Sequence, residues 1–298
     1  MQLNGVTIDD TFAEAFGMKA TRVLITAIDH HWAMQAAHTM TGFATSVIGC
    51  GVEAGIEAQL PGAATPDGRP GVAVLLFGMS GKELAKQLET RIGQCVLTCP
   101  TTAVFAGMDG DERLPLGKNL RYFGDGYQIS KLIDGRRYWR VPVMDGEFLA
   151  EQDTGRCKAI GGGNFLVLAR TQAQALEACM DAVEAMRALP NVVLPFPGGI
   201  VRSGSKVGSK YKALMASTND AYCPTLRGLV PSQLGETTGA VLEIVVNGIA
   251  EQDVGNAMRT GIQAVCEHGQ AGGIQRISAG NYGGKLGQYH FHLHQVLA

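Results

Sequence analysis

Residues 195–224 combine glycines, hydroxyls and cations with almost no apolar periodicity, which is unlike an ordinary core element. The glycines let backbone amides approach a ligand closely, and Arg202, Lys206 and Lys210 place positive charge beside those amides. Backbone amides and cations together suit a carboxylate or a phosphate group. Because long loops within compact domains usually carry function, we favour ligand contact over a merely solvated, glycine-rich loop.

The same stretch lacks the motifs of the common nucleotide-binding sites. Gly199 and Gly204 have the spacing of a Walker loop, but Ser205 stands where that motif requires lysine. A dinucleotide-binding fingerprint of three glycines following a strand is missing as well. The loop therefore predicts an extended anionic ligand other than ATP or NAD.

Glu243 is the candidate for acid–base chemistry. It interrupts the apolar run 240–246, which we predict to be a central strand, and the residue 168 positions earlier is the apolar Leu75. A carboxyl buried in a sheet either finds a cationic partner or has its pKa raised. We favour a raised pKa, which suits proton transfer near neutral pH, over a structural ion pair with an arginine or lysine.

Three histidines near the C-terminus alternate with other residues. On a strand, His290, His292 and His294 would point to one face, as the ligands of a zinc site do. No acidic residue lies close in sequence to complete such a site. We therefore favour solvent-facing or interface histidines and predict that the protein holds no metal.

The seven cysteines favour free thiols in a reducing cytoplasm, because their number is odd and none forms Cys-x-x-Cys. Cys95 and Cys99 could share one helix face, but no second ligand pair follows at zinc spacing. Cys223 lies within the loop region, where it could act as a nucleophile. We favour a packing role for it.

The composition predicts a well-packed cytoplasmic protein. The 298 residues allow one large domain or two of ordinary size, and 46% are hydrophobic while only 17% are charged. That low charge suggests a surface partly covered by subunit contacts. A net charge of −2 gives no support to nucleic-acid binding, no apolar run is long enough to span a bilayer, and the polar N-terminus lacks a signal-peptide pattern.

The predicted elements occur twice in the same order of strand, helix, strand, strand, helix and strand. In the first half they are expected at 21–27, 29–41, 45–48, 71–78 and 80–96, and in the second half at 164–169, 172–189, 191–194, 240–246 and 251–268, with a strand at 273–278 closing the set. Ser80 and Glu83 form a plausible capping box for the second helix. A shift of 168 positions superposes four identical residues, namely Gly71, Glu83, Arg91 and Gly93 on Gly239, Glu251, Arg259 and Gly261.

This order is the split βαβ pattern. It predicts an α+β fold of two tandem ferredoxin-like lobes, each with its helices on one face of an antiparallel sheet. The segment from about 105 to 157 is extra and includes a hairpin at Asp145-Gly146. We place the domains at 1–145, the N-terminal lobe with this insertion, and at 146–298, the C-terminal lobe.

Motifs spread over the whole chain resemble one family, the formylmethanofuran:tetrahydromethanopterin formyltransferases. The motifs are Asn4-Gly-Val, Asp10-Thr-Phe-Ala-Glu-Ala-Phe16, Thr65-Pro-Asp-Gly-Arg-Pro-Gly-Val72, Arg91-Ile-Gly-Gln-Cys95, Phe123-Gly-Asp-Gly-Tyr-Gln128, Gly161-Gly-Gly-Asn-Phe165, the loop 195–224, Glu243-Ile-Val-Val-Asn-Gly248 and Ser278-Ala-Gly-Asn281. The long loop is the most specific of them.

The resemblance implies formyl transfer between formylmethanofuran and N5 of tetrahydromethanopterin, with Glu243 as the acid–base residue. It implies two similar α/β lobes, a homotetramer with its active site in a cleft between subunits, and no metal or tightly bound prosthetic group. Methanofuran and tetrahydromethanopterin would then be carrier substrates. The near-neutral charge is similar to that of the bacterial branch, which implies work within a larger formyltransferase/hydrolase complex.

The residues fit that chemistry, because preorganised donors stabilise the oxyanion of a direct acyl transfer and one carboxyl shuttles the proton. The expected carrier-binding residues are Arg202, Ser205, Lys206, Ser209, Lys210, Asn219, Asp220, Tyr222, Gly124, Asp125, Asn164 and Asn281. An alternative is a non-catalytic, carrier-binding or scaffold component of the complex. The intact Glu243 argues against that alternative.

Overall fold

The computed structural model describes residues 1–110 and 112–298. Its contacts form two compact units, one made of residues 1–17 with 160–298 and the other of residues 18–159. The chain therefore returns its first residues to the unit that contains its C-terminus. Two long strands, β3 (Phe12–Thr26) and β11 (Asp153–Ala169), contribute residues to both units.

The unit that contains both termini is built on an antiparallel sheet in the order β16-β11-β15-β12. Along the chain its elements are β11, α5 (Gln172–Arg187), β12 (Val192–Val193), β15 (Ala240–Gly248), α6 (Glu251–Glu267) and β16 (Ile274–Ser278). The N-terminal residues extend this sheet, with β2 (Val6–Ile8) parallel to β16 and β1 (Gln2–Leu3) antiparallel to β2. Strand β17 (Tyr289–His292) pairs with the first residues of β3 and leads into α7 (Leu293–Leu297).

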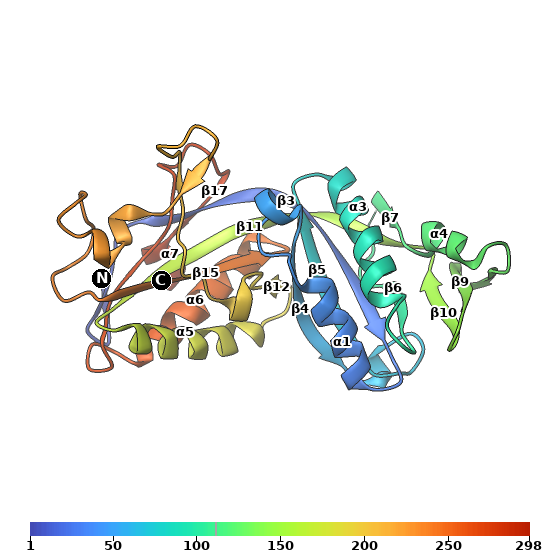
Figure 1. Cartoon of the computed structure of the whole chain (residues 1–298). Helices are drawn as coiled ribbons and strands as arrows, with labels where there is room; N and C mark the ends of the chain where they lie inside the picture. The colour runs from blue at the N-terminus through green and yellow to red at the C-terminus, as the bar shows by residue number, and fades with distance from the viewer. Residues whose placement is uncertain (111) are drawn as a thin grey trace. The chain divides into compact units, whose positions relative to one another are not determined.

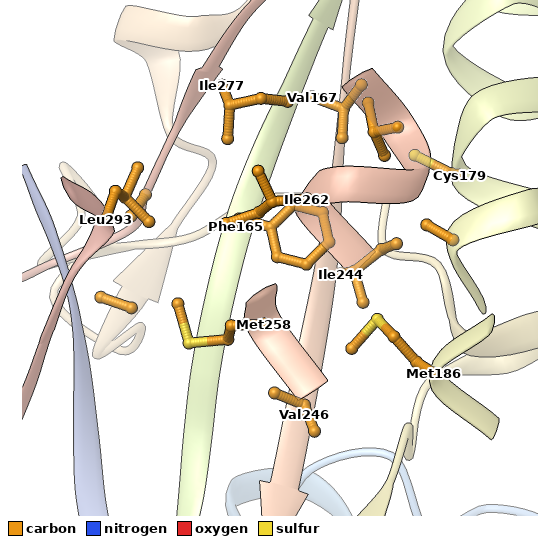
Figure 2. Packing of buried hydrophobic residues seen from close by; sticks show 14 of the residues in the cluster. Phe165, Val167, Cys179, Met186, Ile244, Val246, Met258, Ile262, Ile277 and Leu293 are labelled. Carbon is orange, nitrogen blue, oxygen red and sulfur yellow. The ribbon is translucent and has the colours of Figure 1, made fainter. Parts of the chain in front are cut away.

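Helices α5 and α6 lie side by side and cover one face of this sheet (Figure 1). Strand β15 alternates, so that Leu242, Ile244 and Val246 are buried while Glu243 and Val245 between them are half-buried. Figure 2 shows Phe165, Ile244 and Ile262 meeting between the sheet and the helices. Gly261 permits this packing, because a Cβ there would lie 2.8 Å from Phe165 Cζ.

The second unit repeats this order of elements. Its sheet is antiparallel in the order β4-β5-β3-β6, and its elements are β3, α1 (His30–Thr41), β4 (Glu53–Leu60), β5 (Gly71–Gly78), α3 (Gly81–Arg91) and β6 (Ala103–Ala106). The predicted cap of α3 is confirmed on one side, since Ser80 Oγ accepts a hydrogen bond from the Glu83 amide at 3.2 Å. The Glu83 carboxylate instead accepts from Gln87 Nε2 at 3.0 Å.

The extra segment forms a meander on β6. Strand β10 (Gly146–Glu151) runs parallel to β6, and β9 (Arg136–Val143) and β8 (Ile129–Ile133) follow antiparallel. The predicted hairpin is confirmed, but Val143 pairs with Gly146, so its turn residues are Met144 and Asp145 and not Asp145-Gly146. Strand β7 (Glu112–Pro115) pairs with the start of β11. The short helical elements are α4 (Gly117–Leu120) and the π-helical turn Ile92–Val96. Single 3₁₀ turns lie at Gly62–Ala64, Arg121–Gly124, Pro197–Gly199, Asp220–Tyr222 and Pro224–Leu226.

One predicted strand is wrong. Residues 45–48 were expected to be extended, but α2 (Val47–Cys50) occupies the second half of this range, and the strand begins only at Glu53. Ser46 Oγ accepts from the Ile48 amide at 3.4 Å at the start of the turn, and Gly51 ends it with a φ of 73°. A short apolar run does not by itself distinguish a strand from a helical turn, and these two caps decide the matter.

Candidate active site

Glu243 lies on the face of the sheet opposite α5 and α6. The strand period places its side chain with Val241 and Val245, whereas Leu242 and Ile244 belong to the helix-covered core. The predicted internal position is confirmed only in part. Strand β11 pairs with β15 along its length, but on the other side β12 reaches no further than Asn247, and an isolated bridge to Val201 serves Glu243 itself.

The carboxylate of Glu243 has no cationic partner among the residues that the structure describes. Within residues 1–110 and 112–298 it makes no ion pair and its side chain accepts no hydrogen bond. Desolvation by burial raises the pKa of Glu243 to about 7. This favours the acid–base interpretation over the structural ion pair, because the group can hold or release a proton near neutral pH.

Tyr222 lies over the same face. Its hydroxyl is 3.3 Å from Ser278 Oγ, and Ser278 pairs with Leu166, which pairs in turn with Glu243. Residues directly opposite each other on neighbouring strands point to one side of a sheet. The loop that carries Tyr222 therefore packs on the helix-free face, two strands from Glu243.

The loop between Val201 and Tyr222 is organised by one ion pair. Lys206 Nζ lies 2.5 Å from Asp220 Oδ2, and this pair joins the ends of a small hairpin of β13 (Lys206–Val207) and β14 (Ala216–Ser217). The Lys206 ammonium lowers the pKa of the Asp220 carboxyl. Two of the expected binding residues are therefore brought together, but they neutralise each other.

Other expected loop residues have more freedom. Within residues 1–110 and 112–298, the side chains of Arg202, Ser205 and Lys210 are exposed and make no hydrogen bond or ion pair. The Ser209 hydroxyl accepts from the Tyr211 amide at 3.0 Å, and Asn219 contributes its carbonyl to the turn at Tyr222. Of the cations expected to bind a carrier, Arg202 and Lys210 therefore remain available to an anion.

Arg202 borders a cavity of about 920 Å³ between α5 and residues 196–203. Its floor includes Met180, Ile200 and Leu242, which are apolar. Leu242 faces the helices and Glu243 faces away from them, and Glu243 does not line this cavity. The sheet edge thus separates the Arg202 cavity from the Glu243 carboxyl.

Asn164 and Asn281 have structural partners. The Asn164 side chain donates to Gly280 O at 3.1 Å and accepts from the Gly280 amide at 2.6 Å. Asn281 donates to Phe12 O at 3.2 Å and accepts from the Gly283 amide at 3.1 Å. These two side chains hold the backbone of the segment after β16 in place. Any contact with a ligand would therefore fall to the other side chains of that segment.

Gly124 and Asp125 belong to the other unit. Gly124 is buried, and a Cβ there would lie 2.9 Å from Gln128 Oε1. Asp125 adopts the left-handed conformation at a φ of 49° and ends the turn Arg121–Gly124. Their local geometry is that of a tight turn within residues 18–159.

The three histidines do not share one strand face, so the metal-site alternative that the sequence left less favoured does not form. His290 and His292 flank the Phe12 ring, with centroids at 4.9 and 5.2 Å, but β17 ends at His292. His294 lies in α7, where its ring contacts Ile8 O at 3.0 Å and Asp10 at 3.6 Å. Over residues 1–110 and 112–298, no cluster of three or more His, Cys, Asp or Glu side chains could hold a metal ion.

The cysteines of the chain are free. Burial raises the pKa of the Cys179 and Cys266 thiols to about 12, so both remain protonated packing residues. Cys223 Sγ contacts Asn219 O at 3.4 Å and Thr218 Oγ1 at 3.4 Å. These contacts fit the packing role that the sequence favours for Cys223.

The sheet carries on its helix-free face a carboxyl whose pKa burial raises, and the loop that follows Val201 exposes cations, so the arrangement suits acid–base chemistry on an anionic substrate. Residues 1–143 match the family model described as formylmethanofuran-tetrahydromethanopterin formyltransferase, and residues 146–296 match the model described as the proximal lobe of that family. The chain belongs to the formylmethanofuran-tetrahydromethanopterin formyltransferase family.

Similar proteins cover the whole chain. The formylmethanofuran--tetrahydromethanopterin formyltransferase of Methylococcus capsulatus is 65% identical over 298 residues, with full coverage of both chains. A crystal structure of the formyltransferase/hydrolase complex (FhcABCD) from Methylorubrum extorquens with methylofuran contains a chain 53% identical, at a TM-score of 0.98 and with coverage of 100% and 99%. The formyltransferase of Methanosarcina barkeri is 47% identical, at a TM-score of 0.94 and with coverage of 99% and 100%.

Proposed function

We propose that this protein transfers a formyl group between formylmethanofuran and N5 of tetrahydromethanopterin, with Glu243 as the acid–base residue. Membership of the formyltransferase family supports the reaction class. The observation that carries the role of Glu243 is its unpaired carboxyl on the helix-free face, with a pKa of about 7. Both protonation states are therefore populated at neutral pH, as a residue that takes up and returns a proton requires.

The proton balance of the transfer uses one such group. As N5 attacks the formyl carbon, the new C–N bond forms and Glu243 in its carboxylate form takes the N5 proton. As the tetrahedral intermediate collapses, the bond to the methanofuran nitrogen breaks and Glu243 returns the proton to that nitrogen. No proton is consumed overall, and binding both carriers side by side supplies the proximity.

The cationic loop supports the binding of anionic carriers. Arg202 and Lys210 are exposed without an ion pair within residues 1–110 and 112–298, and they suit the carboxylates or phosphates of an extended ligand. Tyr222 offers a hydroxyl on the face that bears Glu243. We assign Lys206 and Asp220 to holding this loop in shape, and we retain Ser205, Ser209, Asn219, Gly124, Asp125, Asn164 and Asn281 as proposed carrier-binding positions, through side chain or backbone.

The architecture supports an interpretation as two tandem ferredoxin-like lobes. Each unit contains strand, helix, strand, strand, helix and strand, with the first and third strands adjacent in the middle of the sheet. We retain 1–145 and 146–298 as the two halves of the sequence, a division supported by the family matches to 1–143 and 146–296. The packing units differ from these halves, since the first 17 residues pack with the C-terminal half.

We also propose that the protein acts in the cytoplasm as a homotetramer within a larger formyltransferase/hydrolase complex. A relative from Methylorubrum extorquens, whose name makes it one component of a formyltransferase/hydrolase complex, is 53% identical over 301 residues. The free cysteines fit a reducing compartment. Among the described residues, no helix is long and apolar enough to cross a membrane.

The decisive experiment is formyl transfer by the purified protein alone. Formylmethanofuran and tetrahydromethanopterin are mixed with it, and the N5-formyl product is measured by absorbance and mass spectrometry. Turnover establishes the enzyme, and its loss in Glu243→Gln establishes the residue. Binding of both carriers without turnover would instead identify a carrier-binding or scaffold component.

A further inference from the structure

The Glu14 carboxylate is bound inside a loop of backbone amides. Its Oε2 accepts from the amides of Tyr282 and Gly284 at 2.7 and 2.8 Å, and its Oε1 accepts from those of Leu286 and Gly287 at 2.6 and 2.6 Å. Glu14 is only 1% exposed, and in the described part of the chain it forms no ion pair. Residues 281–287, called the Glu14 loop below, therefore wrap an internal anion.

The Glu14 loop requires glycine both where φ is positive and where the backbone packs too closely for a Cβ. Gly283 and Gly284 have φ values of 79° and 71°, which a residue with a Cβ rarely adopts. A Cβ at Gly287 would lie 2.4 Å from Ala15 O and 2.8 Å from Glu14 Cγ, so only glycine approaches this closely. Four backbone amides of the loop thus point inward to Glu14, while the side chains of Tyr282, Lys285 and Leu286 are exposed.

The Glu14 loop is tied to the sheet beside Glu243. Asn164 pairs with Val245 and is therefore a diagonal neighbour of Glu243 on the same face, about 7–8 Å away. The Asn164 side chain binds both backbone groups of Gly280, directly before the loop, and the Glu14 amide donates to Gly280 O at 3.2 Å. Two buried side chains therefore fix the loop relative to the acid–base carboxyl.

A loop that only connected β16 to β17 would not need four hydrogen bonds to one buried carboxylate. Four charge-assisted hydrogen bonds to one buried carboxylate restrict a segment whose outward side chains make few contacts, the Tyr282 ring lying 6.0 Å from that of Phe16. Rigid presentation of an aromatic ring and a cation suits a ligand with a flat ring and a negative charge.

We propose that Glu14 is a positioning residue that holds the Glu14 loop in the conformation in which Tyr282 and Lys285 contact a carrier bound beside Glu243. This proposal rests on the proposed function and adds Tyr282 and Lys285 to the residues that contact a carrier. Glu14 itself touches no carrier. It acts through the four amides, whose acceptor a neutral side chain cannot replace, because the NH₂ group of glutamine would face two of these donors.

The test compares Glu14→Gln with Glu151→Gln in the purified protein. Glu151 is a matched control, since it is also buried, accepts a backbone hydrogen bond from Ala106 at 2.9 Å, and lies in the other unit. KM for each carrier and kcat are measured, together with the rate of trypsin cleavage after Lys285. We expect Glu14→Gln to raise KM for one carrier about fivefold or more, with kcat within about twofold, and to speed cleavage about tenfold.

Two further variants keep the proposal testable if Glu14→Gln does not fold. Tyr282→Ala and Lys285→Ala leave the amides bound to Glu14, and each should raise KM for the same carrier. Glu151→Gln should change neither KM nor cleavage at Lys285. Faster cleavage in Glu14→Gln with unchanged KM in all three loop variants would reduce Glu14 to a structural anchor and overturn the proposal, as would an unchanged cleavage rate.

The proposed function can fail separately. If the wild-type protein binds both carriers without transferring formyl, the Kd of each carrier replaces KM in the same comparison. A weaker Kd for one carrier in the loop variants would then support the positioning role although the enzymatic role had failed. An unchanged Kd would refute the positioning role by itself.

Discussion

Glu243 and Val201 exchange two backbone hydrogen bonds, Val201 N to Glu243 O at 2.7 Å and Glu243 N to Val201 O at 2.9 Å. The residue after Val201 is Arg202, which begins the cationic loop and makes no ion pair among residues 1–110 and 112–298. The backbone of Glu243 is therefore bonded to the residue that precedes the cationic loop. The two proposed roles, anion binding by the loop and proton transfer at Glu243, thus belong to residues that meet at one short strand pair.

Substitution of Glu243 should separate chemistry from binding. We expect Glu243→Gln to lower kcat by about 100-fold or more while the carriers still bind, because glutamine keeps the shape but cannot exchange a proton. Steady-state kinetics and carrier binding measure the two effects. Turnover near that of the wild type in a folded variant would remove Glu243 from the mechanism.

The rate should depend on the protonation of Glu243. Because burial raises its pKa to about 7, kcat/KM should show an apparent pKa near that value, and Glu243→Gln should abolish this inflection. The residual rate of the variant is followed from about pH 5 to about pH 9. An inflection that persists unchanged in the variant would assign the titration to another group.

Stability should change with pH in opposite directions at the two special carboxyls. Glu243 has a raised pKa, so its contribution is present below about 4.5 and is lost as the pH rises through about 7. Burial acts to raise the pKa of Glu14, but the four amides outweigh it and lower the pKa to about 2, so that contribution is present above about 4.5 and lost as the pH falls through about 2.

Urea unfolding across pH measures both effects. At about pH 8 to 9 we expect Glu243→Gln to be more stable than the wild type, and Glu14→Gln to be less stable by up to roughly 3 kcal/mol. The cost of Glu14→Gln should shrink as the pH approaches about 2. A cost independent of pH would mean that the charge of Glu14 is not what the amides bind.

Neutralising the loop should distinguish Arg202 from Lys206. Arg202→Gln should raise KM for an anionic carrier several-fold and weaken the salt dependence of that KM, since the arginine has no ion-pair partner among the described residues. Lys206→Met should act by freeing Asp220, and the double variant with Asp220→Asn should recover part of the loss. Lys82→Gln, on an exposed position of α3 in the other unit, is the control for a lost surface charge. Equal KM values for Arg202→Gln and the control would make the arginine irrelevant to binding.

Transfer should not require a metal. Movement of a formyl group between two nitrogens needs no activated water, and a metal hydroxide would release the group by hydrolysis. We expect activity to survive EDTA and elemental analysis to find no stoichiometric metal. Loss of activity in EDTA, with recovery on adding zinc, would overturn this expectation and direct attention to His290 and His292.

Sequence patterns predicted much of the architecture because the signals are local. Apolar runs of limited length, periodic helices, the cap at Ser80 and the turn signal near Asp145 each report on their own backbone. The repeat at 168 residues and the isolated acid in 240–246 identified Glu243 as a buried carboxyl with a raised pKa. These inferences need only the period of the residues within one element and a comparison of the two halves of the sequence.

The tertiary structure decided what depends on distant partners. The sequence could not reveal that Lys206 is neutralised by Asp220, that Asn164 binds Gly280, or that His294 leaves the strand of His290. Glu14 carries a signal like that of Glu243, an acid within an apolar strand, but its four amides lie 268 to 273 positions later in the chain. Whether a buried carboxyl is held charged or kept near neutrality is set by donors brought to it in space, and only the folded chain supplies them.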